Sequence, residues 1–206
     1  MNMKPILKLF SLFMIWTLLG CGETTLSEYK FSDREQVLTC EGMDSKLLNE
    51  ALYAFEDDIK TFYRSKYNPE GKLGLVYSEF LSRSIQGTVP FQDLVTPHTL
   101  KVFNVLKTKK ELWDIENKVS KLNYYSPIFG CIASNIKDNG LKTTLNALVS
   151  THSMNPKLFN DPLIGKYPIV ETDKYLGAYV AFDLFYAKLF DIDPTKVKER
   201  ELINYY

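Results

Sequence analysis

Hydrophobic residues recur every three or four positions along most of this 206-residue chain, which is the spacing that places them on one face of an α-helix. The first such stripe starts at Asp44 or Ser45, either of which can cap a helix, and runs to about residue 63. A second stripe follows the Asn-Pro-Glu-Gly break at residues 68–71 and continues to Gly87. The pattern therefore predicts two successive helices in this part of the chain.

The middle of the chain continues the helical spacing with one ambiguous stretch. Thr96-Pro97 is typical of a helix start with proline at the first position, and the apolar residues of 112–122 form a further stripe that could continue the same helix. Residues 128–133 are a short apolar run that fits a strand or a buried helix, because periodicity cannot separate the two at this length. The apolar positions of residues 141–149 predict another helix.

The C-terminal part combines a proline-rich stretch with the most apolar helix. Residues 154–168 contain three prolines and are predicted to form an ordered loop. Thr172 or Asp173 can then cap a strongly apolar helix that ends near Phe190, and a last, charged helix is expected from residue 193. With no internal repeat in the sequence, these patterns predict an all-α fold: a single-domain, irregular bundle of about six to seven helices.

The first twenty residues have a different character from the rest. Lys4 and Lys8 come without any acid, and an apolar run covers residues 9–19. That run is shorter than the roughly 20 residues needed to span a bilayer, so a stable transmembrane helix is not expected. A basic start, a short apolar run and a small residue at its end are typical of a secretory signal peptide.

The apolar run ends in Leu18-Leu19-Gly20-Cys21, which resembles the lipobox of bacterial lipoproteins, although Leu19 stands where a smaller residue is commoner. The resemblance implies cleavage before Cys21 and attachment of acyl chains, palmitate among them, to that residue. Two or more acyl chains give stable membrane anchoring. Because residue 22 is glycine and not aspartate, the resemblance implies the outer membrane if the cell is Gram-negative.

The chain accordingly divides into a lipoprotein signal peptide (1–20), a polar, flexible tether (21–39) and a helical globular domain (40–206). The 25 basic residues of the whole chain match its 25 acidic residues, and cleavage removes Lys4 and Lys8 but no acid. A nucleic-acid-binding protein normally carries a basic excess. We therefore expect that the protein does not bind nucleic acid. The expected partners are a membrane, which it contacts through the anchor at Cys21, and an envelope protein.

Two cysteines remain once Cys21 carries lipid. In an oxidising compartment an even number of cysteines favours a disulfide, here between Cys40 and Cys131. The alternative is a pair of buried free thiols, since free cysteine is among the most buried residue types.

Known catalytic and metal-binding motifs are missing from the sequence. The two histidines, His98 and His152, do not form an i, i+4 pair, and no zinc-finger spacing, nucleophile elbow or phosphate-binding loop occurs. His152 follows hydroxyl residues, yet a position at a helix end explains it more simply. The acidic run at 56–58 could bind a divalent cation, but consecutive helical residues diverge, so a solvated face is favoured. We predict no catalytic residue, no metal and no cofactor.

One carboxylate falls among apolar positions. At 100° per residue Asp183 lies beside an arc that holds Tyr175, Tyr179 and Tyr186. A charge there needs a partner, which makes a structural aspartate bonded to a tyrosine hydroxyl or a cation the favoured interpretation. The alternative is that these four residues line an aromatic pocket that binds a ligand.

The sequence therefore supports an expectation about location more firmly than one about activity. The leading hypothesis is a cell-envelope lipoprotein whose domain is a non-catalytic partner-binding or structural module. A small-molecule or glycan-binding lipoprotein with an aromatic-lined pocket is the first alternative. An envelope hydrolase, whose site would need polar groups converging in one cavity, is the second.

Overall fold

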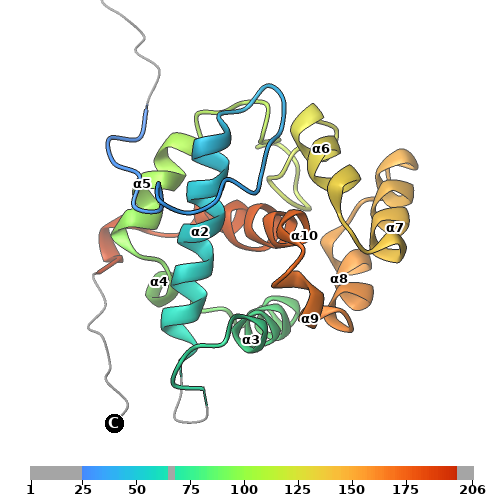
Figure 1. Cartoon of the computed structure of the whole chain (residues 1–206). Helices are drawn as coiled ribbons and strands as arrows, with labels where there is room; N and C mark the ends of the chain where they lie inside the picture. The colour runs from blue at the N-terminus through green and yellow to red at the C-terminus, as the bar shows by residue number, and fades with distance from the viewer. Residues whose placement is uncertain (1–24, 65–67, 199–206) are drawn as a thin grey trace, which may run out of the picture.

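A computed structural model describes residues 25–64 and 68–198 of the chain, and these residues contain nine α-helices and no strand (Figure 1). The α-helices are α2 (Ser45–Phe62), α3 (Leu73–Gln86), α4 (Phe91–Leu94), α5 (Pro97–Leu106), α6 (Pro127–Asn135), α7 (Asn139–Ser150), α8 (Pro156–Ile164), α9 (Tyr167–Val170) and α10 (Lys174–Tyr179). The all-α prediction is confirmed. The helix number exceeds the expected six to seven because α4, α8 and α9 lie in stretches that were not predicted to be helical.

Helix α2 is capped as predicted and then enclosed by its neighbours. The Asp44 carboxylate accepts the backbone N–H groups of Lys46 and Leu47, at 2.9 and 3.3 Å. Helices α3 and α5 both pack against α2. The Phe55 ring lies 5.1 Å from Phe80 of α3, measured between ring centroids. Aromatic pairs at this distance bury large apolar areas, so α2 has little surface left for water.

The centre of the molecule is one continuous helical run that changes its winding twice (Figure 1). After α10 the chain forms a π-helix, η1 (Val180–Phe185), and then a 3-10 helix, η2 (Tyr186–Asp191). Asp173 caps the run by accepting the Leu176 N–H at 3.2 Å, as the sequence predicted. Every residue from 176 to 187 is buried. A helix covered on all sides has no polar face, which explains its hydrophobicity.

The stretch 112–122, predicted as a helix, forms a loop closed by a single antiparallel bridge between Trp113 and Leu122. The buried ends, Leu112 and Leu122, have the spacing of a helical stripe, but Ile115 and Val119 between them are exposed. The two buried leucines mark the places where the loop begins and ends, and they do not belong to one face of a helix. This prediction was wrong, because apolar spacing alone does not require the intervening residues to share one face.

The proline-rich stretch 154–168 was predicted as a loop and instead forms α8 and α9. The Asn155 side chain caps α8, and Pro156 occupies the first turn, where a missing N–H costs nothing. Similarly, Ser126 caps α6 ahead of Pro127, which settles the ambiguous run 128–133 as helix. The charged helix expected from residue 193 is a single 3-10 turn, η3 (Pro194–Lys196), and residues after 198 lie outside the described part.

Residues 25–39 do not form the flexible tether that their polar composition predicted. They pack as an N-terminal arm along α2 (Figure 1), with Leu26, Phe31 and Leu38 buried. Glu50 of α2 accepts the backbone N–H groups of Lys30 and Phe31, at 2.7 and 3.0 Å. The arm therefore belongs to the domain, and the predicted boundary at residue 40 is too late.

A second polar residue of α2 satisfies the other end of the arm. The Asn49 carbonyl oxygen accepts the N–H groups of Val37 and Leu38, at 2.8 and 3.0 Å, and its amide donates to the carbonyls of Leu38 and Ser45. The Tyr53 hydroxyl donates to the Glu35 carbonyl at 2.6 Å. An irregular segment needs such side-chain partners because it has no ladder of its own backbone hydrogen bonds.

The arm ends in the predicted disulfide. Cys40 and Cys131, on α6, are joined with an S–S distance of 2.08 Å and a Cα–Cα distance of 5.8 Å. The prediction that this pair lies close enough to bridge is confirmed. Cys21 lies outside the described residues. Among the helices that the structure describes, none is both long enough and apolar enough to cross a bilayer.

Candidate functional site

Asp183 is a fully buried carboxylate on the π-helix η1. The Ser120 hydroxyl donates to it at 2.5 Å, and the Tyr124 hydroxyl donates to its two oxygens at 2.9 and 3.1 Å. Both partners come from the loop that precedes α6. The predicted structural role, a buried aspartate bonded to hydroxyl groups, is confirmed.

Burial is the largest influence on the acidity of this group and raises the pKa of Asp183 above the ordinary value of 3.8. Hydrogen bonds from Ser120 and Tyr124 favour the charged form but do not outweigh burial. The Tyr179 hydroxyl is close enough to lower the pKa of Asp183, yet it has no described partner within hydrogen-bonding geometry.

The Asp183 carboxylate fixes a surface loop, here called the anchored loop, residues 112–124. Ser120 also accepts the Leu122 N–H at 3.1 Å, so its hydroxyl joins Asp183 to the loop backbone. The Asp114 N–H donates to the Lys121 carbonyl at 2.8 Å, across the loop. At the far side of the loop the side chains of Ile115 and Val119 are 54% and 46% exposed. The loop is therefore fixed at its base, and its tip exposes Ile115 and Val119 on either side of the charged residues Glu116 and Lys118.

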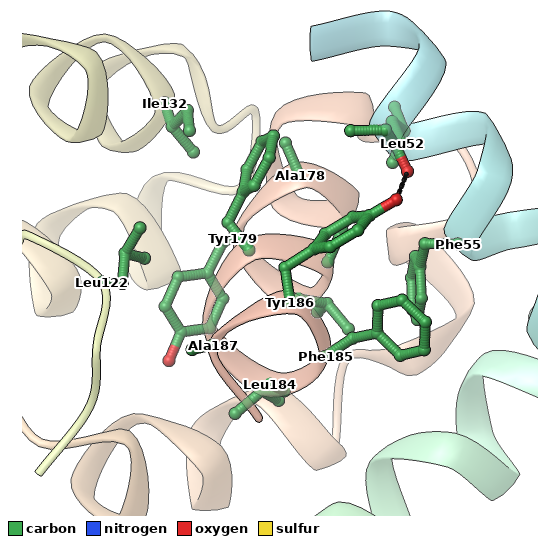
Figure 2. Close-up of a cluster of buried hydrophobic side chains, with 14 of the residues drawn as sticks. Leu52, Phe55, Leu122, Ile132, Ala178, Tyr179, Leu184, Phe185, Tyr186 and Ala187 are labelled. Carbon is green, nitrogen blue, oxygen red and sulfur yellow. Dashed lines mark hydrogen bonds between the residues drawn. The ribbon is translucent and has the colours of Figure 1, made fainter. Parts of the chain in front are cut away.

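None of the four residues proposed to line an aromatic pocket belongs to the lining of the two cavities described below. Asp183, Tyr179 and Tyr186 are fully buried, and Figure 2 shows Tyr179 and Tyr186 leaving the central run on different sides. The Tyr186 hydroxyl donates to the Ala51 carbonyl of α2 at 2.9 Å. Tyr175 is half-buried and contacts Thr39 of the arm at 3.3 Å. These side chains are packing and hydrogen-bonding elements of the core.

The acidic run at 56–58 was predicted as a solvated face, and this is wrong for two of its three residues. Glu56 and Asp58 are buried, with 4% and 1% exposed. Glu56 pairs with Lys174 of α10 at 2.8 Å and accepts a hydrogen bond from the Tyr77 hydroxyl at 3.1 Å. The helical pattern missed this because α2 is covered on more than one side.

A polar cavity of about 220 Å³ lies beside this pair, where the arm and the start of α3 meet the C-terminal half of α2. This cavity, here called the cationic cavity, is lined by Arg34, Glu56, Asp57, Lys60, Thr61, Arg64 and Leu73. Sequence reasoning missed the cavity because its walls come from three separate segments. The acidic run at 56–58 was the only part of this lining that the sequence pattern indicated, and it suggested a site for a cation. A second cavity of about 180 Å³ lies between α5 and η2 and is mainly apolar.

Each of the two histidines contacts a neighbouring side chain of the fold. The His98 Nε2 atom lies 2.7 Å from Glu50, the residue that also holds the arm. His152 adopts a left-handed backbone conformation (φ 55°) at the end of α7, and its ring stacks on Tyr125 with centroids 4.9 Å apart. A helix-end position was the favoured interpretation of His152 from the sequence, and it is confirmed.

No group of three or more histidine, cysteine or acidic side chains that could hold a metal ion occurs among the described residues. The structure therefore has two candidate sites, the anchored loop and the cationic cavity. Comparisons of this chain with protein-family models, with curated proteins and with solved structures found no match.

Proposed function

We propose that this chain is a cell-envelope lipoprotein, anchored through Cys21, whose helical domain is a non-catalytic module that binds an envelope protein partner. The lipobox-like signal supports the anchor. The disulfide between Cys40 and Cys131 supports an oxidising compartment, because disulfides persist in secreted and periplasmic proteins and are rare in the cytosol. In a Gram-negative cell the outer membrane is the proposed destination.

The anchored loop is the observation that carries the binding role. A buried carboxylate is costly to desolvate, and the hydrogen bonds that satisfy Asp183 hold Ser120 and Tyr124 in defined positions. Here Asp183 fixes the base of a loop that exposes two large aliphatic side chains. Binding residues are concentrated on loops that a rigid scaffold positions. The contact surface we assign is therefore the loop tip around Ile115 and Val119.

The anchor is tested by metabolic labelling with a fatty-acid analogue. The wild-type protein should incorporate the label, and the Cys21→Ser variant should not, because only the thiol can receive the diacylglyceryl group. The Cys40→Ser variant serves as the control and should be labelled like the wild type. Label that persists in Cys21→Ser would overturn the anchor.

The binding surface is tested by photo-crosslinking in cells, with a photoreactive amino acid placed at residue 115 or 119. Both positions should give adducts with the same protein, identified by mass spectrometry. Leu158 on α8 is the matched control, because it is an aliphatic residue that is 56% exposed but lies outside the loop. Equal adducts from residue 158, or none from the loop, would contradict the assignment.

A further inference from the structure

The cationic cavity has an unusual charge arrangement for its size. Its two carboxylates, Glu56 and Asp57, are already paired with lysines outside the lining: Lys174 at 2.8 Å and Lys30 at 3.0 Å. Arg34 and Lys60, which do line the cavity, form no ion pair with a described carboxylate. The cavity wall therefore keeps positive charge that the protein itself does not neutralise.

Arg34 is held in place without such a partner. Its guanidinium carbon lies 4.7 Å from the centroid of the Phe31 ring and 5.0 Å from that of Tyr53. Cations over aromatic faces are stabilised by the ring quadrupole, and this contact leaves the N–H groups of a guanidinium available at its edge. The arm therefore presents a positioned, unneutralised guanidinium at the cavity.

The remaining lining fits an anion with several oxygens. Thr61, next to Lys60 near the end of α2, and Arg64, two residues after that helix ends, also line the cavity. Guanidinium groups bind phosphate through paired hydrogen bonds, while lysine acts as a compact charge and a hydroxyl as an additional donor. A volume of about 220 Å³ is smaller than the roughly 300–1,000 Å³ of pockets for drug-sized ligands, which points to a small ligand.

We propose that the cationic cavity binds a phosphate group, with Arg34 and Lys60 as its principal contacts. The group can belong to a free phosphate anion or to the headgroup of an anionic phospholipid, since both present the same oxygens. This inference goes beyond the proposed partner binding and depends on neither the lipid anchor nor the anchored loop. The test of phosphate binding can therefore fail while those two proposals hold. Equally, those proposals can fail while phosphate binding is confirmed.

The test is isothermal titration calorimetry on the mature protein, purified in an uncharged detergent and a phosphate-free buffer. Two probes are titrated separately: inorganic phosphate, and glycerophosphoglycerol, the water-soluble headgroup of phosphatidylglycerol. At least one should bind with one-to-one stoichiometry. Tighter binding of inorganic phosphate identifies a free anion as the ligand, and tighter binding of glycerophosphoglycerol identifies a lipid headgroup.

The variants Arg34→Gln and Lys60→Gln should each weaken binding about tenfold, as loss of one charge-assisted contact predicts. Lys101→Gln is the matched control, because Lys101 is an exposed lysine on α5 away from the cavity, and it should bind like the wild type. Both affected side chains are exposed, so the melting temperature should stay close to that of the wild type. Absence of binding of both probes at about 10 mM, or equal affinities in all variants, would overturn the proposal.

Discussion

A single carboxylate, Asp183, connects the core of this protein with its surface. The group lies on a helix among residues that are all buried. It accepts hydrogen bonds from the hydroxyl groups of two residues of one loop. An apolar residue at this site would leave the hydroxyl groups of Ser120 and Tyr124 without an acceptor. The aspartate therefore determines where the loop lies more than how well the core is packed.

The Asp183→Ala variant should be destabilised by about 2–4 kcal/mol, because two buried hydroxyl groups lose their acceptor and a small cavity remains. Chemical unfolding in urea measures this free energy. Asp183→Asn keeps an acceptor oxygen and should lose less. Asp191→Ala, at an exposed carboxylate of the same helical run, is the control and should change stability by no more than about 0.5 kcal/mol. Equal stability of Asp183→Ala and wild type contradicts the assigned role.

The same residue predicts a pH dependence. Because burial raises the pKa of Asp183 in the folded protein, the folded state holds this proton at pH values where the unfolded chain has released it. The wild type should therefore lose stability relative to Asp183→Asn as the pH rises from about 4 towards the raised pKa. Urea unfolding of both proteins across this range measures the difference. A difference that stays constant with pH, or changes in the opposite direction, excludes the raised pKa.

The sequence could predict the burial of Asp183 but not its partners. Its flanking residues are apolar on every side of the helical wheel, and this information is local. Ser120 lies 63 residues away along the chain, in a loop that was predicted as helix. Contacts at such separation depend on the tertiary fold, and no periodicity within one segment encodes them.

At the scale of elements, the arm shows how α2 organises a segment without regular structure. Two consecutive polar residues, Asn49 and Glu50, are buried on a helix and bind four backbone N–H groups of the arm between them. Buried polar groups are tolerated when all their hydrogen bonds are made. These side chains replace the backbone partners that a helix or strand would supply.

Asn49→Ala should therefore cost about 2–3 kcal/mol, as several hydrogen bonds are lost and buried N–H groups are left unpaired. The amides of Val37 and Leu38 should exchange with deuterium faster than in the wild type, while amides at the centre of α10 should change less. Hydrogen-exchange mass spectrometry measures both. Asn104→Ala, at an exposed asparagine of α5, is the control. Unchanged exchange at the arm would show that Asn49 does not hold it.

The sequence predicted long helices well and short or irregular elements poorly. The helix starts at Asp44, Thr96 and Asp173 were predicted to within one residue, because a capping side chain acts within three residues. The arm was missed because its apolar residues, Leu26, Phe31 and Leu38, follow neither helical nor strand spacing. Its order comes from α2, which the composition of the segment itself does not reveal.

For the whole molecule, the disulfide is the covalent link between the arm and the helices after residue 126. It joins positions 91 residues apart in sequence, so it removes many conformations from the unfolded chain. The all-α architecture and this pairing could both be anticipated, the first from periodicity and the second from the number of cysteines. The cationic cavity could not, since its walls come together only in the folded chain.

Replacing both cysteines, as Cys40→Ser with Cys131→Ser, should lower the free energy of unfolding by about 2–5 kcal/mol. Urea unfolding of this variant, compared with the wild type under oxidising conditions, measures the loss. Addition of a reductant should bring the wild type to the stability of the variant and leave the variant unchanged. A wild type whose stability is insensitive to full reduction would show that the bond does not contribute.

The packed arm also limits how far the domain can travel from a membrane. If Cys21 carries the proposed lipid, it lies only five positions before Leu26, which is already buried in the domain. A chain of that length spans at most about 18 Å even when fully extended. Diffusion of the domain is then confined to a thin layer above the bilayer. Within this layer its effective concentration towards a membrane-bound molecule is high, whereas a molecule fixed farther away is out of its reach.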